Sequence, residues 1–158
     1  MTHSLHLPNG PNGLEIYDIE TPEHSVILPY YSSSVQAGFP SPADDYVELS
    51  LDLLKFMVDK PHATFCVRVK GNSMEGATIV DGSLLVVDRS KTVKNNDIII
   101  AVLNGEYTVK RFRKEKGNVW LIPEHPAYEQ ILVKEDMDFQ IWGVVTFIIN
   151  QPNNVRPY

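Results

Sequence analysis

The sequence predicts a mainly β protein, with a strongly twisted, part-closed antiparallel sheet as its body, a short helix and an extended N-terminal arm. Three observations carry this prediction. Six segments after Pro61 are rich in β-branched and aromatic residues, as strands are. Asn104-Gly105 joins two of these segments directly, which is the strongest short hairpin signal. The first forty residues are punctuated by proline and glycine, which favour turns.

Residues 1–40 form the predicted arm. Two Pro-Asn-Gly triplets stand within residues 6–13, and the apolar residues that follow are separated by turn formers. Such a segment has too little periodic apolar surface to fold alone, so we expect it to lie extended over a body. The predicted division is an arm at 1–40, a folded domain at 41–150 and a C-terminal tail at 151–158.

The segment 43–59 carries the only helical signal. Apolar residues recur there at helical spacing, namely Leu49, Leu53, Phe56 and Met57. Asp44 and Asp45 suit the start of a helix, where the helix dipole favours negative charge, and Pro61 ends the pattern. We expect one or two short helices here.

The predicted strands follow in sequence order, at 63–69, 83–88, 97–103, 106–112, 118–123 and 139–149. Lys116-Gly117-Asn118 marks a second tight connection after the one at Asn104-Gly105. Short connections between successive strands favour antiparallel neighbours, which is why the body is expected to be one antiparallel sheet.

Charge and composition exclude several classes of protein. The formal net charge of −6 and the pI of about 5.3 give no general field that attracts nucleic acid, so we expect no direct sequence-specific DNA binding. The one basic cluster, at 110–116, is typical of a solvated strand edge. The single cysteine, Cys66, excludes an intrachain disulfide. Neither a signal peptide nor a run of ~20 apolar residues is present, which predicts a cytoplasmic protein without a membrane span.

No metal site or cofactor is expected. The five histidines are scattered, without a pair at helical spacing beside a carboxylate, and no CxxC motif occurs. No glycine-rich loop leads from a predicted strand into a helix, so a nucleotide cradle is also unsupported.

Nucleophilic catalysis is the class of chemistry that remains. Ser73 lies between Gly71 and Gly76, and a serine hydroxyl becomes a nucleophile only when a base accepts its proton. No histidine stands in a matching motif. The alternative base is a neutral lysine, whose pKa must be lowered by burial among apolar groups.

The strand at 106–112 offers one such lysine. Alternation along a strand places Thr108, Lys110 and Phe112 on one face and Tyr107, Val109 and Arg111 on the other. The pattern does not say which face is buried. From the residues alone, a turn-forming Ser73 and a solvent-facing Lys110 therefore stay open beside the catalytic interpretation.

Taken together, GNSMEGATIVDGSLLVVD at 71–88 and EYTVKRF at 106–112 resemble the LexA/UmuD-like family of Ser-Lys self-cleaving peptidases. Three further stretches resemble the UmuD-type members that act in SOS mutagenesis, namely AGFPSPADDYVE at 37–48, LIPEHPAY at 121–128 and WGVVTFII at 142–149. The resemblance covers residues 35–150, so the domain at 41–150 is expected to be a LexA/UmuD-like peptidase domain.

Position by position, the resemblance implies that Ser73 is the nucleophile and Lys110 the general base. It implies that the bond between Ala37 and Gly38, within the chain's own arm, is the one that is cut. Gly71 and Met74 are candidates for the oxyanion site or the pocket wall.

The function implied by the resemblance is that of an SOS-response protein whose self-cleavage is stimulated by the RecA–single-stranded DNA filament. The cut form is then expected to be a homodimer that joins a UmuC-like subunit in an error-prone translesion polymerase. The first forty residues lack the length and periodicity of a helix-turn-helix domain, so a repressor is not expected. The alternatives are a signal-peptidase-like or phage-repressor-like Ser-Lys peptidase and a non-catalytic adaptor that regulates a polymerase.

Overall fold

A computed structural model describes residues 15–18, 27–31 and 48–152. The described residues fall into two compact units. The larger unit joins Glu15–Asp18 to the chain from Lys60 onward, and the smaller unit holds the described residues between Thr21 and Asp59. The larger unit contains both residues of the expected catalytic pair.

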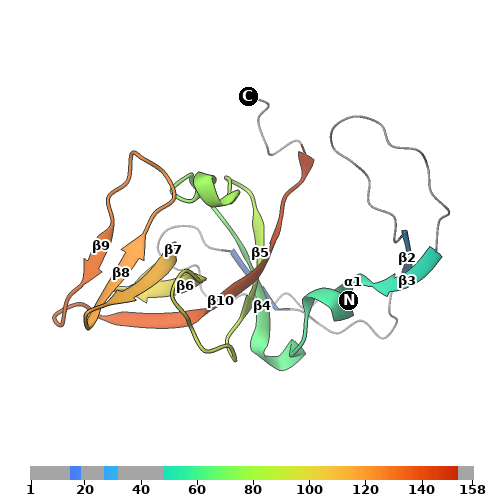
Figure 1. The fold of residues 1–158 in the computed structure, drawn as a ribbon, viewed down its shortest axis with the longest axis horizontal. Coiled ribbons are helices and arrows are strands. Elements are labelled where there is room, and N and C mark those ends of the chain that lie inside the picture. Colours follow the sequence, from blue (N-terminus) through green and yellow to red (C-terminus); the bar gives the residue numbers. More distant parts are fainter. Residues whose placement is uncertain (1–14, 19–26, 32–47, 153–158) are drawn as a thin grey trace. The chain divides into compact units, whose positions relative to one another are not determined.

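The larger unit is built on one antiparallel sheet of eight strands (Figure 1). Its strand order is β1-β4-β5-β10-β6-β7-β8-β9. The strands are β1 (Glu15–Asp18), β4 (Thr64–Arg68), β5 (Leu84–Asp88), β10 (Phe139–Ile149), β6 (Ile98–Leu103), β7 (Glu106–Glu115), β8 (Asn118–Ile122) and β9 (Ile131–Val133). The prediction of a mainly β, antiparallel body is confirmed, and the sheet remains open because β1 and β9 do not pair with each other.

Two tight hairpins frame β7. Asn104 and Gly105 have φ of 51° and 83°, and Lys116 and Gly117 have φ of 49° and 84°. Positive φ at both central residues is the turn geometry whose twist matches that of antiparallel strands. The hairpin predicted at Asn104-Gly105 and the tight connection predicted at Lys116-Gly117 are both confirmed.

Strand β10 holds the two sides of the sheet together (Figure 1). One part of it pairs with β6 from Phe139 to Val144, and the other pairs with β5 from Val144 to Ile149. The register shifts once in each part, between Ile141 and Gly143 and between Val145 and Phe147. Such irregularities bend a strand and increase its twist, so β10 can curve from one side of the sheet to the other.

The smaller unit corrects the helix prediction. Residues 48–52 form strand β3 (Glu48–Asp52), which pairs with β2 (Ile27–Tyr31), and only Leu53–Met57 forms a helix, α1. The residues ELSLD alternate apolar and polar, which fits a strand as well as a helix, and pairing with β2 satisfies the main chain. Asp52 ends the strand by accepting a hydrogen bond from the Lys55 N–H and so begins α1. Residues 43–47 lie outside the described residues.

Two buried clusters stabilise the larger unit. The first contains Phe65, Val67, Val69, Met74, Ile79, Leu85, Val87, Ile100 and Val109. The second contains Ile99, Ala101, Phe112, Leu121 and Val144. Ile99 and Ile100, which are neighbours along β6, therefore belong to different clusters, because side chains of a strand alternate between the two faces of the sheet. Both faces of β7 are buried near its middle, where Val109 and Lys110 lie.

Candidate active site

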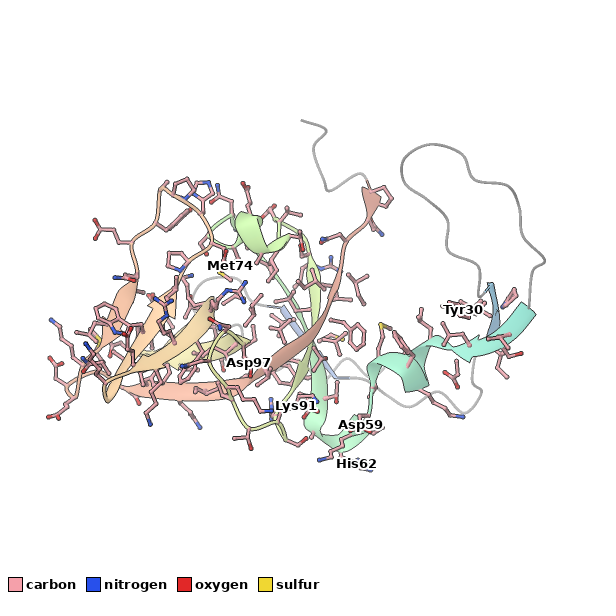
Figure 2. All side chains as sticks on the ribbon, in the orientation of Figure 1. Tyr30, Asp59, His62, Met74, Lys91 and Asp97 are labelled. Atoms are coloured by element: carbon pink, nitrogen blue, oxygen red, sulfur yellow. The ribbon has the colours of Figure 1, made fainter. Side chains whose placement is uncertain are left out.

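The turn that carries Ser73 is held by buried neighbours. Met74 and Ile79 are 1% and 0% exposed and belong to the first cluster, and the Ile79 N–H donates to the Met74 carbonyl. Figure 2 labels Met74 at the foot of the short 3-10 helix η2 (Glu75–Ala77). Gly71 has φ of 98°, a conformation that favours glycine, and its N–H donates to Asp81 Oδ1 at 2.7 Å. Ser73 is therefore held in two ways. The next residue, Met74, is buried in the core, and Asp81 binds Gly71 near the start of the turn.

Lys110 lies in the middle of β7, where the hydrogen-bond ladder fixes its position. Its partner across the ladder is Ile99, which is fully buried, and Lys110 itself is only 8% exposed. Burial of a lysine is unusual, and it disfavours the charged ammonium. Burial accordingly lowers the pKa of Lys110 below its ordinary value of 10.5.

The structure brings Ser73 and Lys110 together. Lys110 Nζ lies 2.9 Å from Ser73 Oγ, 3.1 Å from Thr108 Oγ1 and 2.9 Å from the Val109 carbonyl oxygen. A neutral amine has two N–H groups and one lone pair, which these three neighbours can satisfy if the Ser73 hydroxyl donates to the lone pair. This arrangement suits proton transfer from the hydroxyl to the amine.

A pocket opens at the pair. Its lining comes from the Ser73 turn and from β7: Val69, Lys70, Gly71, Ser73, Met74, Tyr107, Thr108, Val109 and Lys110. Gly71 and Met74, the candidates for the pocket wall, both line it. From Glu106 to Lys110, β7 pairs with β6 on one side, and its pairing with β8 on the other side begins only at Arg111. Among the described residues, one edge of β7 therefore borders the pocket without a strand partner.

The main-chain donors of the turn differ in availability. The Gly71 N–H is engaged by Asp81, whereas no hydrogen bond from the N–H of Ser73 or Met74 is found within the described part of the chain. The Ser73 and Met74 N–H groups are therefore main-chain candidates to stabilise an oxyanion beside Ser73 Oγ.

Sequence reasoning missed three contributors to the site. Thr108 lies two residues before Lys110, on the same face of the strand. This spacing could have predicted its contact with Lys110 Nζ. Asp81 fixes Gly71, and Glu124 contacts the Ser73 turn across more than forty residues of sequence, which no local pattern reveals. The basic cluster at 110–116 was expected to be a solvated strand edge. This prediction is right for the exposed Arg113, Lys114 and Lys116, but wrong for the buried Lys110 and the half-buried Arg111.

Ala37 and Gly38 lie outside the described residues, so their position relative to Ser73 stays a prediction. Over residues 15–18, 27–31 and 48–152, no group of three or more histidine, cysteine, aspartate or glutamate side chains is arranged to hold a metal ion. Within the same ranges, no helix has the length and apolar character needed to cross a membrane.

Comparison with known proteins places the chain in a family. The model of the family described as Peptidase S24-like matches residues 29–146, which include Ser73, Lys110 and the Ala37–Gly38 bond. The chain belongs to the Peptidase S24-like family. It is 37% identical to protein ImpA of Salmonella typhimurium over an alignment of 164 residues, which covers 99% of this chain and all of ImpA.

Two further relatives extend the comparison of this Peptidase S24-like chain. Protein MucA of Escherichia coli is 40% identical over 131 residues, covering 82% of this chain and 89% of MucA. The LexA repressor of Caldicellulosiruptor saccharolyticus is 37% identical over 145 residues, covering 91% of this chain and 70% of the repressor. The expected relationship to the LexA/UmuD-like family is therefore confirmed.

Proposed function

We propose that this Peptidase S24-like protein cleaves its own chain between Ala37 and Gly38, with Ser73 as nucleophile and Lys110 as general base. The observation that carries the proposal is the 2.9 Å separation between Ser73 Oγ and the Nζ of a lysine that is almost fully buried. Burial keeps the amine a usable base by lowering its pKa, and proximity lets it accept the hydroxyl proton directly.

The reaction runs in two stages. Ser73 Oγ attacks the Ala37 carbonyl carbon as its proton passes to Lys110 Nζ, and the Ser73 and Met74 N–H groups stabilise the resulting oxyanion. The C–N bond then breaks, and the Lys110 ammonium returns the proton to the leaving amine of Gly38. Water, deprotonated by Lys110, attacks the ester between Ser73 and Ala37 and restores the free hydroxyl.

The substrate is an extended peptide. The edge of β7 from Glu106 to Lys110 borders the pocket without a strand partner in the described chain, and an extended segment can hydrogen-bond along such an edge. Alanine and glycine on the two sides of the scissile bond let the peptide main chain approach the hydroxyl closely. The arm supplies this sequence at a high local concentration.

The relatives ImpA and MucA support a role in SOS mutagenesis. In the proposed role, the RecA–single-stranded DNA filament stimulates the cut. If the docked state of the arm is a minor population, a filament that favours this state accelerates cleavage without adding catalytic groups. The cut form is a dimer that acts as the accessory subunit of an error-prone, UmuC-like translesion polymerase.

Incubation of the purified chain, alone and with RecA, single-stranded DNA and nucleotide, tests the proposal by intact mass. A new N-terminus at Gly38 is expected, and Ser73→Ala and Lys110→Ala are each expected to abolish it. Cleavage at Gly38 that persists in either variant overturns the dyad. A chain that is never cut, yet still modulates a polymerase, identifies the non-catalytic adaptor instead. Cleavage of other chains but not of this one identifies a signal-peptidase-like protease.

A further inference from the structure

The segment after β8 contacts the Ser73 turn at several points. The Glu124 N–H donates to the Ser73 carbonyl at 2.9 Å, and the Glu124 carbonyl accepts from the Gly76 N–H at 2.7 Å. The Tyr128 hydroxyl donates to Asn72 Oδ1 at 2.6 Å. The main chain of Glu124 is thus bonded to the turn at the nucleophile itself and again three residues after it.

The side chain of Glu124 reaches in a different direction. Its carboxylate accepts a hydrogen bond from Arg111 Nε, and the two side chains are each 28% exposed. Arg111 Nη1 also donates to the Asn96 carbonyl at 2.6 Å, so the guanidinium is held from two sides. Arg111 is the residue after Lys110, and it is the point at which β7 begins to pair with β8.

Apart from Lys110 itself, Glu124 is therefore the one described residue that is hydrogen-bonded both to Ser73 and to a residue adjacent to Lys110, which is Arg111. The two members of the pair come from elements that are 37 positions apart, and their 2.9 Å contact requires those elements to keep a fixed separation. We propose that Glu124 is a positioning residue that sets the Ser73–Lys110 distance, through its main chain on one side and its ion pair with Arg111 on the other.

The proposal rests on the self-cleavage proposed above. In it, Glu124 acts on the distance between Ser73 and Lys110 and not on the basicity of Lys110. A misplacement of about 1 Å at a reacting pair can cost roughly 100-fold in rate. Loss of the ion pair is therefore expected to lower the cleavage rate by roughly 10- to 100-fold. Because the desolvation of Lys110 remains, the pH at which the rate levels off is expected to stay unchanged.

The test measures unstimulated self-cleavage of the full chain against pH for Glu124→Ala, Glu124→Gln, Arg111→Ala and the double variant Arg111→Ala/Glu124→Ala. Circular dichroism at each pH identifies folded samples. The glutamine keeps an acceptor oxygen for Arg111 Nε, so Glu124→Gln is expected to retain more activity than Glu124→Ala. Because the pair acts as a unit, the double variant is expected to cleave about as slowly as either alanine variant. Glu129→Ala and Arg113→Ala change exposed charges of the same segment and strand and serve as matched controls.

The outcomes separate this inference from the proposed function. If Ser73→Ala and Lys110→Ala abolish cleavage but Glu124→Ala and Glu124→Gln cleave at the wild-type rate, the positioning role is wrong and the dyad stands. Additive losses in the double variant, or a displaced pH midpoint, likewise overturn the positioning role. If Glu124→Ala does not fold, Arg111→Ala decides the question, because it removes the same ion pair. Cleavage at the wild-type rate overturns the positioning role, and a loss of roughly 10- to 100-fold that Arg113→Ala does not show supports it.

Discussion

The Nζ of Lys110 lies 2.9 Å from the hydroxyl oxygen of Ser73, although the two residues are 37 positions apart in the chain. The lysine is 8% exposed, and burial lowers its pKa. An amine in this setting differs from an ordinary surface lysine in two ways that experiments can separate. It is held by fixed partners, among them the hydroxyls of Ser73 and Thr108, and it loses its proton at a lower pH.

Arginine in place of lysine separates charge from basicity. Lys110→Arg keeps a cation on β7, but a guanidinium does not lose its proton in proteins, so we expect no cleavage at any pH. Intact-mass measurements over several days provide the readout, with Arg113→Lys as the control on the exposed part of the same strand. Appreciable cutting by Lys110→Arg would mean that a different group acts as base.

The pH dependence of unstimulated cleavage follows from the lowered pKa of Lys110. Below this pKa most of the lysine is protonated, so the rate is expected to rise about tenfold per pH unit. Above it the lysine is already neutral and the rate levels off, at a pH below the ordinary lysine value of 10.5. Rates measured between pH 6 and ~10 test this expectation, and a flat profile would contradict a lysine base.

Thr108 tests the orientation of the amine. Its Oγ1 lies 3.1 Å from Lys110 Nζ and accepts an N–H, a bond that is stronger to the ammonium than to the neutral amine. Thr108→Val is therefore expected to lower the pKa of Lys110 further and move the pH midpoint down. The plateau rate is expected to fall roughly 10-fold, because the lone pair is less well directed at Ser73. Thr108→Ser keeps the hydroxyl and is expected to behave like wild type; equal loss in both variants would exclude this role.

Burial of Lys110 also predicts a stability effect of known sign. Its folded-state pKa is lower than the ~10.4 expected in the unfolded chain, so between the two values the unfolded chain binds more protons. The free energy of unfolding therefore rises with pH across that window, and the charging penalty is fully present below it. Each unit of difference between the two pKa values corresponds to about 1.4 kcal/mol.

Urea unfolding at several pH values tests the sign, in a Ser73→Ala background that prevents cleavage. The background protein is expected to gain stability relative to Ser73→Ala/Lys110→Met as pH rises from 7 towards ~10. A constant difference between the two proteins across that range would show that Lys110 is not held with a lowered pKa.

Gly76 tests the contact between the Ser73 turn and the segment after β8. A Cβ at this position would lie 2.7 Å from the Glu124 carbonyl oxygen, which is main chain and cannot rotate away. Gly76→Ala is expected to cost about 1–3 kcal/mol of stability and to slow cleavage, because the turn must shift. Glu75→Ala, an exposed neighbour, is expected to change stability by less than about 0.5 kcal/mol. Thermal unfolding and cleavage rates of both variants test this expectation. If Gly76→Ala has the stability and cleavage rate of wild type, the turn can shift without cost.

Much of the body could be predicted from the sequence because its strands combine β-branched residues with short, glycine-containing turns. The helix prediction failed at 48–52 because ELSLD satisfies two periodicities, and pairing with β2 selects the strand. Strand β9 was missed because it has only three residues.

The sequence could not predict that the face of β7 that carries Lys110 is buried. Alternation assumes that one face of a strand is exposed, whereas Val109 and Lys110 are both buried. Ser73 and Lys110 were paired through the family resemblance, and no local pattern predicts which distant strand a turn will meet. For the same reason Glu124 was not recognised as part of the site. Its contacts with Ser73 and Arg111 exist only after β7 and β8 have paired.

Strand β1 gives the proposed cut a further consequence. It is joined to β4 by four residue pairs, from Glu15 opposite Arg68 to Asp18 opposite Phe65, and it precedes Ala37 in the chain. After cleavage at Ala37–Gly38, β1 would no longer be tethered through the arm and would become a separate ligand of the β4 edge. Its occupancy would then follow mass action, so dilution would release the fragment while a concentrated solution would retain it. Cutting the peptide bond and uncovering β4 would thus be two events with different rates.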